Sequence, residues 1–197
     1  NNANAGPIDV PAPTPRLSYA VLVQRYRDGK PYDEPFVLPG ESYFEADDRI
    51  RLVVSAPGAG HLYVVNEETA AAGGASNFNT LFPSPTANGG KSLVPAGGTV
   101  NIPDGGWFKF DAARTVEKLW LVWSAEPIPE LEALERLANP TDKGAIPTGS
   151  EAAWVARFLA DTAAASRATV TRDAEKRRST LASTGTTLVH AVLLEHR

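Results

Sequence analysis

Hydrophobic and polar residues alternate along several stretches of the chain, beginning near the N-terminus. Leu17, Tyr19, Val21 and Val23 fall on one side, and the residues between them fall on the other. A period of two places successive side chains on opposite faces of a β-strand, so this pattern indicates strands with one buried face. The pattern predicts strands in these ranges: 17–24, 49–55, 61–66, 78–82, 99–103, 107–110, 116–123 and 187–195.

Turn residues and strand positions indicate which of these strands pair. Asp28-Gly29 is a strong turn signal. Pro57-Gly-Ala-Gly60 separates the strands at 49–55 and 61–66, which predicts a β-hairpin. The C-terminal strand needs a partner, and we expect the first strand to be that partner because chain ends often lie close together.

After Pro129 the hydrophobic residues change to helical spacing. Leu131, Leu134 and Leu137 predict an amphipathic helix over 130–138, which ends at Asn139-Pro140. Ser150 with Glu151 is typical of a helix start, and apolar residues then recur at helical spacing to about Ser166: Trp154, Val155, Phe158 and Leu159. Residues 169–184 fit either strands or a helical turn, so their structure stays open.

These elements indicate a mainly β protein. We expect an immunoglobulin-like antiparallel β-sandwich with two helices inserted before the C-terminal strand. Residues 1–16 are expected to form a Pro-rich linker or processed N-terminal segment, and residues 17–197 a single sandwich domain with its helical insertion at about 129–168. The 16 glycines and 16 prolines among 197 residues favour a turn-rich β protein over a helical bundle.

Composition excludes several classes of function. The 23 acidic residues outnumber the 19 lysines and arginines, and the net charge of −4 excludes a globally basic nucleic-acid binder. The absence of cysteine excludes thiol catalysis, disulfides, cysteine zinc sites and iron–sulfur clusters. No stretch approaches about 18 consecutive apolar residues, so we expect no membrane span within this chain.

The N-terminal segment has the composition of a spacer. The chain begins at Asn1 without a methionine, and residues 5–15 are rich in proline and nearly uncharged. Our hypothesis is that this spacer follows a secretion signal, a lipid anchor or an upstream domain.

Several short motifs follow one another in the central part of the chain. They are Phe44-Glu-Ala-Asp-Asp-Arg-Ile-Arg-Leu, Gly60-His-Leu-Tyr-Val-Val-Asn, Leu81-Phe-Pro, Val94-Pro-Ala-Gly, Ile102-Pro and a strand that ends in Trp123-Ser. This order resembles a widespread bacterial family catalogued only as a domain of unknown function, whose members look like small β-sandwiches in envelope and signalling proteins. The resemblance covers about residues 17–125, with Ala46-Asp47 in place of Gly-Asp and Gly60-His61 in place of Gly-Tyr. The family has no agreed activity, so the resemblance implies no catalytic residue.

Residue types that carry chemistry occur without the spacing that the chemistry needs. Gly89-Gly-Lys-Ser92 lacks both the upstream glycine and the following helix of a phosphate-binding loop. His190 and His196 share a strand but lie about 20 Å apart, too far to bind one metal ion, and His61 would have to come from another strand. No catalytic, cofactor-binding or metal-binding residue is therefore expected, and no cofactor.

Two charged clusters favour solvent-exposed positions. Glu45, Asp47 and Asp48 lie just before a strand, beside two arginines, and we interpret them as a solvated strand entrance; an acid–base pair or calcium ligands are the alternatives. Lys176-Arg-Arg178 follows two acidic residues, which favours a solvated turn over a phosphate-binding stripe.

Three functions remain open. The first is a non-catalytic binding or assembly module of a bacterial cell-envelope protein, which contacts another protein through an edge strand or the loops of residues 67–106. The second is a module that binds glycan or peptide through exposed aromatic residues such as Trp107. The third, ranked last, is a hydrolase that uses Asp47 and Asp48 as its acidic pair.

The candidate contacts with a ligand or partner are Trp107, Phe78 and Phe82. Trp107 lies beside Gly105-Gly106, so it is the best candidate for an exposed ring. We expect a protein partner or a larger envelope assembly, and no nucleic acid. The expected location is periplasmic or extracellular, with an upstream anchor as one hypothesis, and the alternative is a cytoplasmic domain of a larger signalling protein. The oligomeric state stays open.

Overall fold

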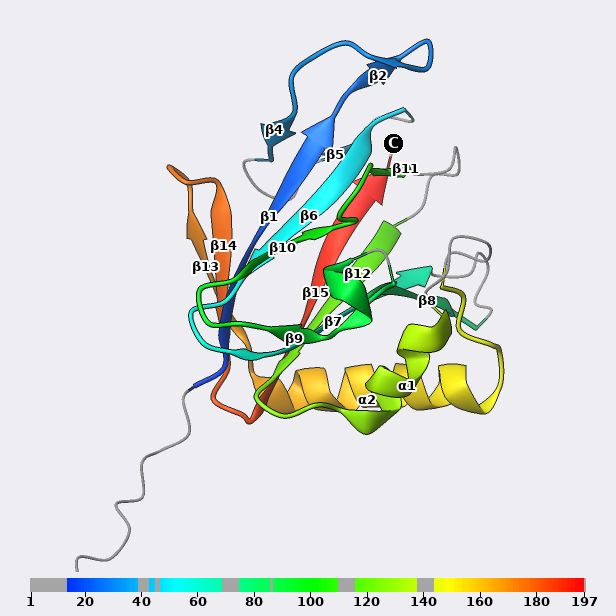
Figure 1. Cartoon of the computed structure of the whole chain (residues 1–197), viewed down its shortest axis with the longest axis vertical. Coiled ribbons are helices and arrows are strands. Elements are labelled where there is room, and N and C mark those ends of the chain that lie inside the picture. The colour runs from blue at the N-terminus through cyan, green and yellow to red at the C-terminus, as the bar shows by residue number, and fades with distance from the viewer. Residues whose placement is uncertain are drawn as a thin grey trace, which may run out of the picture.

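Two β-sheets pack face to face and enclose the main hydrophobic core (Figure 1). The computed structural model describes residues 14–38, 43–44, 47–68, 75–85, 87–109, 116–137 and 144–196. Paired strands in it run antiparallel except for the short parallel pair of β5 and β15. The prediction of a mainly β, antiparallel fold is therefore confirmed, whereas the linker predicted at 1–16 lies almost entirely outside the described residues.

The first sheet has seven strands in the main order β10-β6-β1-β14-β13, with β4 beside β1 and β11 beside β6. Its strands are β1 (Arg16–Gln24), β4 (Phe36–Val37), β6 (Arg49–Ser55), β10 (Thr99–Ile102), β11 (Phe108–Lys109), β13 (Thr169–Asp173) and β14 (Arg178–Ala182). A separate hairpin of β2 (Tyr26–Arg27) and β3 (Lys30–Pro31) extends from the end of β1. Its turn is Asp28-Gly29, both with positive φ, as the turn signal predicts.

The second sheet has six strands in the order β5-β15-β12-β7-β8, with β9 beside β7. Its strands are β5 (Tyr43–Phe44), β7 (Gly60–Glu68), β8 (Asn77–Phe82), β9 (Leu93–Val94), β12 (Val116–Ser124) and β15 (Thr187–His196). A short 3-10 helix, η2 (Asn88–Gly90), precedes β9. The central strand β12 pairs with β15 on one side and with β7 on the other along almost its whole length.

The strand pattern explains the core between the sheets. Leu17, Leu52, Leu121 and Leu188 lie on the faces of their strands that meet between the sheets, and all four are 0% exposed. Each comes from a different strand, so the core is a layer of side chains from both sheets and not a local cluster.

The two helices cover the outer face of the second sheet (Figure 1). They are α1 (Pro129–Leu134), continued by the 3-10 turn η3 (Glu135–Leu137), and α2 (Ser150–Ser166). Their buried faces form a second core with Tyr63, Val65 and Val122 of the sheet. Because β7 and β12 are buried on both faces, they carry apolar residues at successive positions.

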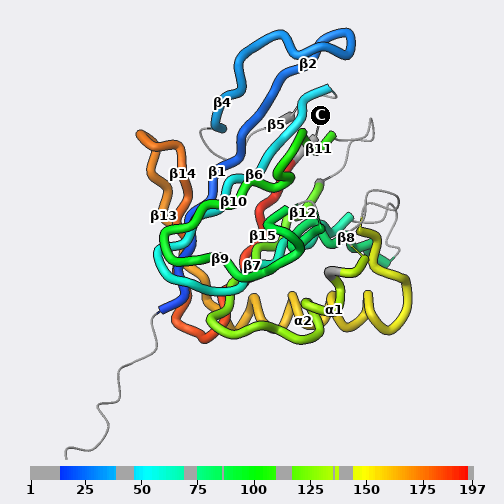
Figure 2. Tube along the Cα trace, in the orientation of Figure 1, coloured from blue at the N-terminus to red at the C-terminus, as the bar shows by residue number. Residues whose placement is uncertain are grey.

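Two predicted strand pairings are wrong. β6 and β7 do not form a hairpin, because β6 pairs with β1 and β10 in the first sheet whereas β7 pairs with β12 and β8 in the second. Pro57-Gly-Ala-Gly60 instead carries the chain from one sheet to the other (Figure 2). The first and last strands, β1 and β15, also belong to different sheets, and they face each other across the core, where the rings of Tyr19 and His190 lie 6.1 Å apart.

Residues 169–184, which the sequence leaves open, form a hairpin of β13 and β14. Thr169 pairs with Ala182 and Asp173 pairs with Arg178, so the four residues between the strands form the turn. Arg177 in this turn adopts the left-handed conformation, with φ of 49°. The hairpin extends the first sheet beyond the edge of β1 (Figure 1), and residues of its turn line a pocket together with residues of β15.

Candidate binding groove at the open edge of the sandwich

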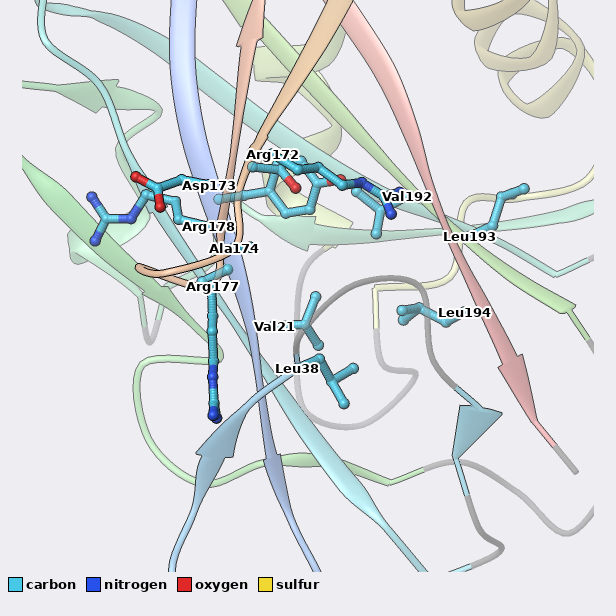
Figure 3. Close-up of a pocket in the computed structure, with 13 residues that line it drawn as sticks. Val21, Leu38, Arg172, Asp173, Ala174, Arg177, Arg178, Val192, Leu193 and Leu194 are labelled. Atoms are coloured by element: carbon cyan, nitrogen blue, oxygen red, sulfur yellow. The ribbon is translucent and has the colours of Figure 1, made fainter.

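A groove opens where the first sheet is interrupted beside β1 (Figure 3). On this side β1 pairs with β14 up to Tyr19 and with β4 from Leu22 onward. The stretch between these contacts, Ala20 and Val21, faces the gap. The groove has a volume of about 180 Å³ and reaches from this gap to β15 of the second sheet.

The floor of the groove is apolar. Val21, Leu38, Val192 and Leu194 line it, and each is at most 9% exposed. Figure 3 shows Val21, Leu38 and Leu194 directed toward a common space between the two sheets. Leu38 is held there because its backbone N–H donates to the Val21 carbonyl at 2.9 Å. The groove therefore gives access to the edge of the main core.

The rim of the groove carries arginines of the β13–β14 hairpin. Arg172 extends across the groove toward Val192, and Arg177 extends toward β4 (Figure 3), where its Nη1 donates to the Val37 carbonyl at 3.5 Å. Arg178 points away from the apolar floor in the same view. Two guanidinium groups thus border an apolar space.

Asp173 is the one acidic residue among the described residues that line the groove, and its carboxylate interacts with Lys176. The backbone N–H of Lys176 donates to Asp173 Oδ1 at 2.9 Å, and Lys176 Nζ lies 3.6 Å from Oδ2. The hydrogen bond from the Lys176 backbone, with the nearby ammonium, lowers the pKa of Asp173. The groove therefore presents a net positive rim.

One wall of the groove is an edge of the second sheet. β15 pairs with β12 along its length, but on its other side it pairs within the described residues only with β5, at Glu195 and His196. The Val189 N–H points to this open side, because it donates to Ser166 Oγ of α2 at 3.2 Å. Backbone groups alternate along a strand, so Ala191 and Leu193 also direct their N–H and C=O groups to the open side.

The sequence-predicted contact residues do not come together. Phe78 is 4% exposed under the helices and Phe82 is 0% exposed in the main core, so neither ring is available to a partner. The prediction that Phe78 and Phe82 contact a ligand or partner is wrong, because one ring packs under the helices and the other packs in the main core. Trp107 is half-buried beside β11, with the Arg51 guanidinium 4.6 Å from its ring centroid.

The remaining titratable residues that the sequence suggested do not form a common site. Asp48 is 7% exposed whereas Asp47 is exposed, and Glu45 lies outside the described residues. His61 Nδ1 lies 2.7 Å from Ser92 Oγ, and the His190 ring centroid lies 6.1 Å from that of Tyr19 across the core. The two histidines therefore have different surroundings. Within the described ranges no three His, Asp or Glu side chains gather where they could hold a metal ion. Among the helices of the described chain, none has the length and apolar character needed to cross a membrane.

A polar cluster that the sequence does not reveal fastens α1 to the second sheet. Glu132 accepts hydrogen bonds from Tyr63 Oη at 2.6 Å and from Ser92 Oγ, and His61 Nδ1 lies 2.7 Å from Ser92 Oγ. Burial and the neighbouring carboxylate raise the pKa of Tyr63 to about 12. Tyr63 and Ser92 are at most 2% exposed, so this cluster holds the helix and offers no accessible nucleophile.

A second charged cluster lies near the start of α2. Glu67 accepts from Trp120 Nε1 at 2.8 Å, from Ser76 Oγ at 2.9 Å and from Lys118 Nζ at 3.2 Å, and its side chain is 12% exposed. Burial alone would raise the pKa of Glu67, but these three donors together lower it below its ordinary value. The network links Glu67 of β7 to β12 and to Ser76, the residue that precedes β8.

We expect this network to make stability depend on pH. A carboxyl group whose pKa is lowered by folding stabilises the protein above its ordinary pKa, and this contribution is lost as the pH falls through the folded-state pKa. At neutral pH, Glu67→Gln should lower the free energy of unfolding by about 2 kcal/mol. Urea titrations from neutral pH to about pH 3 should show the difference between wild type and variant shrinking. A difference that stays constant over this range would contradict the assignment.

The comparisons with family models, with curated proteins and with solved structures each gave no match. The groove was missed because the sequence analysis interprets Lys176-Arg-Arg178 as a solvated turn. The runs Thr169-Val-Thr and Ser179-Thr-Leu favour strands and could have indicated a hairpin, but nothing local indicates that its arginines meet β15.

Proposed function

We propose that this chain is a non-catalytic binding module that takes up an extended segment of a partner protein along the open edge of β15. The observation that carries the proposal is the coincidence, in one groove, of an open strand edge, an apolar floor and an arginine rim. An edge strand with unpaired backbone groups is a template for an added strand. We further propose that the two sheets belong to the immunoglobulin-like class of sandwich.

The geometry of strand addition sets the apolar part of the ligand. An extended peptide beside Ala191 and Leu193 would place every second side chain over the groove floor. Val192 and Leu194 line that floor together with Val21, so apolar side chains fit there. The intervening side chains would lie toward Leu193, which is 43% exposed.

The charge of the hairpin sets the polar part of the ligand. Between Arg172 and Arg178 the chain carries four cations and two acidic residues. Arg172 crosses the groove, within reach of a peptide that lies on β15 (Figure 3). A guanidinium binds carboxylates through two parallel hydrogen bonds, so acidic side chains near the apolar positions should be preferred.

Binding of a defined peptide library tests this function. The probes are fluorescein-labelled peptides of about nine residues that combine valine, isoleucine or leucine with aspartate or glutamate in alternation. We expect acidic–apolar peptides to bind at least about tenfold more tightly than basic–apolar peptides, because the rim is cationic. Arg172→Glu should abolish this preference. Arg157→Glu is the matched control, because Arg157 is exposed on α2 on the other side of the second sheet.

Backbone pairing can be tested without changing the protein. Methylating alternate backbone nitrogens of a binding peptide removes the donors that face β15, and we expect binding to be lost in one register of methylation and kept in the other. Equal binding of both methylated peptides, or equal binding to wild type and Arg172→Glu, would contradict strand addition in this groove.

We also propose that the module serves a bacterial envelope protein. The Pro-rich segment at residues 5–15 and the order of the central motifs support this location. Fractionation of cells that express the complete gene tests it: recovery of the protein in the periplasm or the membrane fraction agrees with the proposal, and recovery in the cytosol contradicts it.

A further inference from the structure

Two arginines lie on aromatic rings at the outer face of the first sheet, away from the groove. Arg49 and Arg51 alternate on β6 with Ile50 and Leu52, which are at most 1% exposed in the core, so the two arginines share the opposite face. Arg49 Cζ lies 3.6 Å from the ring centroid of Tyr26. Arg51 Cζ lies 4.6 Å from the ring centroid of Trp107. This surface belongs to neither helix layer, because both helices cover the second sheet.

The loop before β11 holds one of these cations in place, and β11 adds another. Arg51 donates from Nε and Nη2 to the Gly106 carbonyl, at 3.2 and 2.6 Å. Lys109 of β11 is in register with Arg49, and it is exposed. A further pair, in which Arg27 Cζ lies 4.6 Å from the ring centroid of Tyr32, lies on the opposite face of the β2–β3 hairpin from Tyr26. The residues on the outer face of the first sheet form a surface, which we call the arginine–aromatic surface: Arg49, Arg51, Lys109, Tyr26 and Trp107.

The charge of this surface is not neutralised within the part of the chain that the structure describes. Arg25 lies 4.0 Å from a carboxylate oxygen of Asp33, but none of Arg27, Arg49 and Arg51 has a described carboxylate within ion-pair distance. Asp47 and Asp104 are close in the sequence, and both are exposed. Arg49 and Arg51 are partly exposed, with Arg49 Nε buried, and Lys109 is exposed. Their charges therefore have no counter-charge from a described residue.

We infer that the arginine–aromatic surface binds an anionic polysaccharide through the carboxylate or sulfate groups along its chain. A stacked guanidinium keeps N–H groups in its plane that can bind such oxyanions in pairs. Arg49 and Arg51 are two residues apart on a strand, so their charges repeat at about 7 Å along a flat face. The rings of Tyr26 and Trp107 add apolar surface beside each charge, as a sugar ring requires.

The same features disfavour other polyanions. Single-stranded nucleic acid needs free aromatic faces for its bases, but a guanidinium occupies one face of each ring here. Nucleic acid is also more densely charged, and the whole chain carries a net charge of −4. A membrane surface would need apolar side chains to insert, and none of the described exposed large hydrophobic residues lies on this surface.

Binding to defined polyanions tests the inference. The probes are heparin for sulfate, polygalacturonate for carboxylate, a single-stranded oligonucleotide, and vesicles with anionic phospholipid. We expect heparin or polygalacturonate to bind wild type in a salt-sensitive manner, and the double variant Arg49→Gln/Arg51→Gln to bind at least about tenfold more weakly. Which of the two binds more tightly identifies sulfate or carboxylate as the recognised group.

Matched variants separate this site from folding and from the groove. Arg51→Lys keeps the charge but loses the paired hydrogen bonds, so it should weaken binding less than the double variant while leaving the thermal midpoint nearly unchanged. Arg157→Gln and the groove variant Arg172→Glu should bind the polysaccharide like wild type. Equal binding by wild type and the double variant would overturn the inference, and so would tighter binding of the oligonucleotide or the vesicles than of either polysaccharide.

Discussion

Replacing Leu121 with alanine should lower the free energy of unfolding by about 3 kcal/mol, within the range of about 2–5 kcal/mol for buried leucines. Leu121 is 0% exposed at the middle of β12, between β15 and β7. Its side chain faces the first sheet across the main core. The substitution removes apolar area from the core and leaves a cavity that strands paired on both sides cannot close.

Urea denaturation followed by circular dichroism measures this loss. Leu193→Ala is the matched control, because Leu193 is on the neighbouring strand but is 43% exposed. It should cost less than about 1 kcal/mol. Similar losses for the two variants would mean that the sheets do not enclose Leu121 as described.

Replacing Gly60 with alanine should destabilise the protein by about 2–3 kcal/mol, although only one methyl group is added. A Cβ at Gly60 would lie 2.6 Å from Cζ2 of Trp123 and 2.8 Å from the Ser124 carbonyl oxygen. Both contacts are too short, and Ser124 O belongs to the backbone of the paired strand β12. The chain enters the second sheet at Gly60, so relief of the clash would have to move that sheet or the Trp123 ring.

Gly58→Ala provides the control in the same connection. Gly58 is exposed, and a Cβ there would meet no atom within 4 Å. We expect this variant to unfold within about 0.5 kcal/mol of wild type, or to be slightly more stable, because alanine restricts the unfolded chain. If thermal unfolding places Gly60→Ala at the wild-type midpoint, the close approach of β7 to Trp123 is wrong.

The positions of strands and helices follow from the sequence more closely than their pairing does. Alternation at 17–24 and 116–123 predicts β1 and β12 nearly to their ends, and the spacing of apolar residues predicts α2 from Ser150 to Ser166. These are local patterns, set by one buried face. Pairing depends on contacts between distant segments, so Pro57-Gly-Ala-Gly60 fits a hairpin and a crossing between sheets equally well.

The candidate contacts show the same limit for the functional surface. Phe78 and Phe82 are on the predicted strand β8, but a strand pattern does not tell which of its faces meets a helix. Arg172 and Arg51 carry no special motif, and they become notable only when β15 and Trp107 lie beside them. Trp107 is the one sequence-predicted contact that stays half-exposed at a charged surface.

Amide hydrogen exchange of β15, followed by NMR with the tightest peptide of the library, tests the strand-addition account most directly. Without peptide, the amides of Ala191 and Leu193 should exchange faster than those of His190 and Val192, which face β12. Saturating peptide should slow Ala191 and Leu193 by at least about tenfold and leave His190 and Val192 nearly unchanged. Amides of Ala191 and Leu193 that are already protected without peptide, or that exchange at the same rate with it bound, would contradict the account.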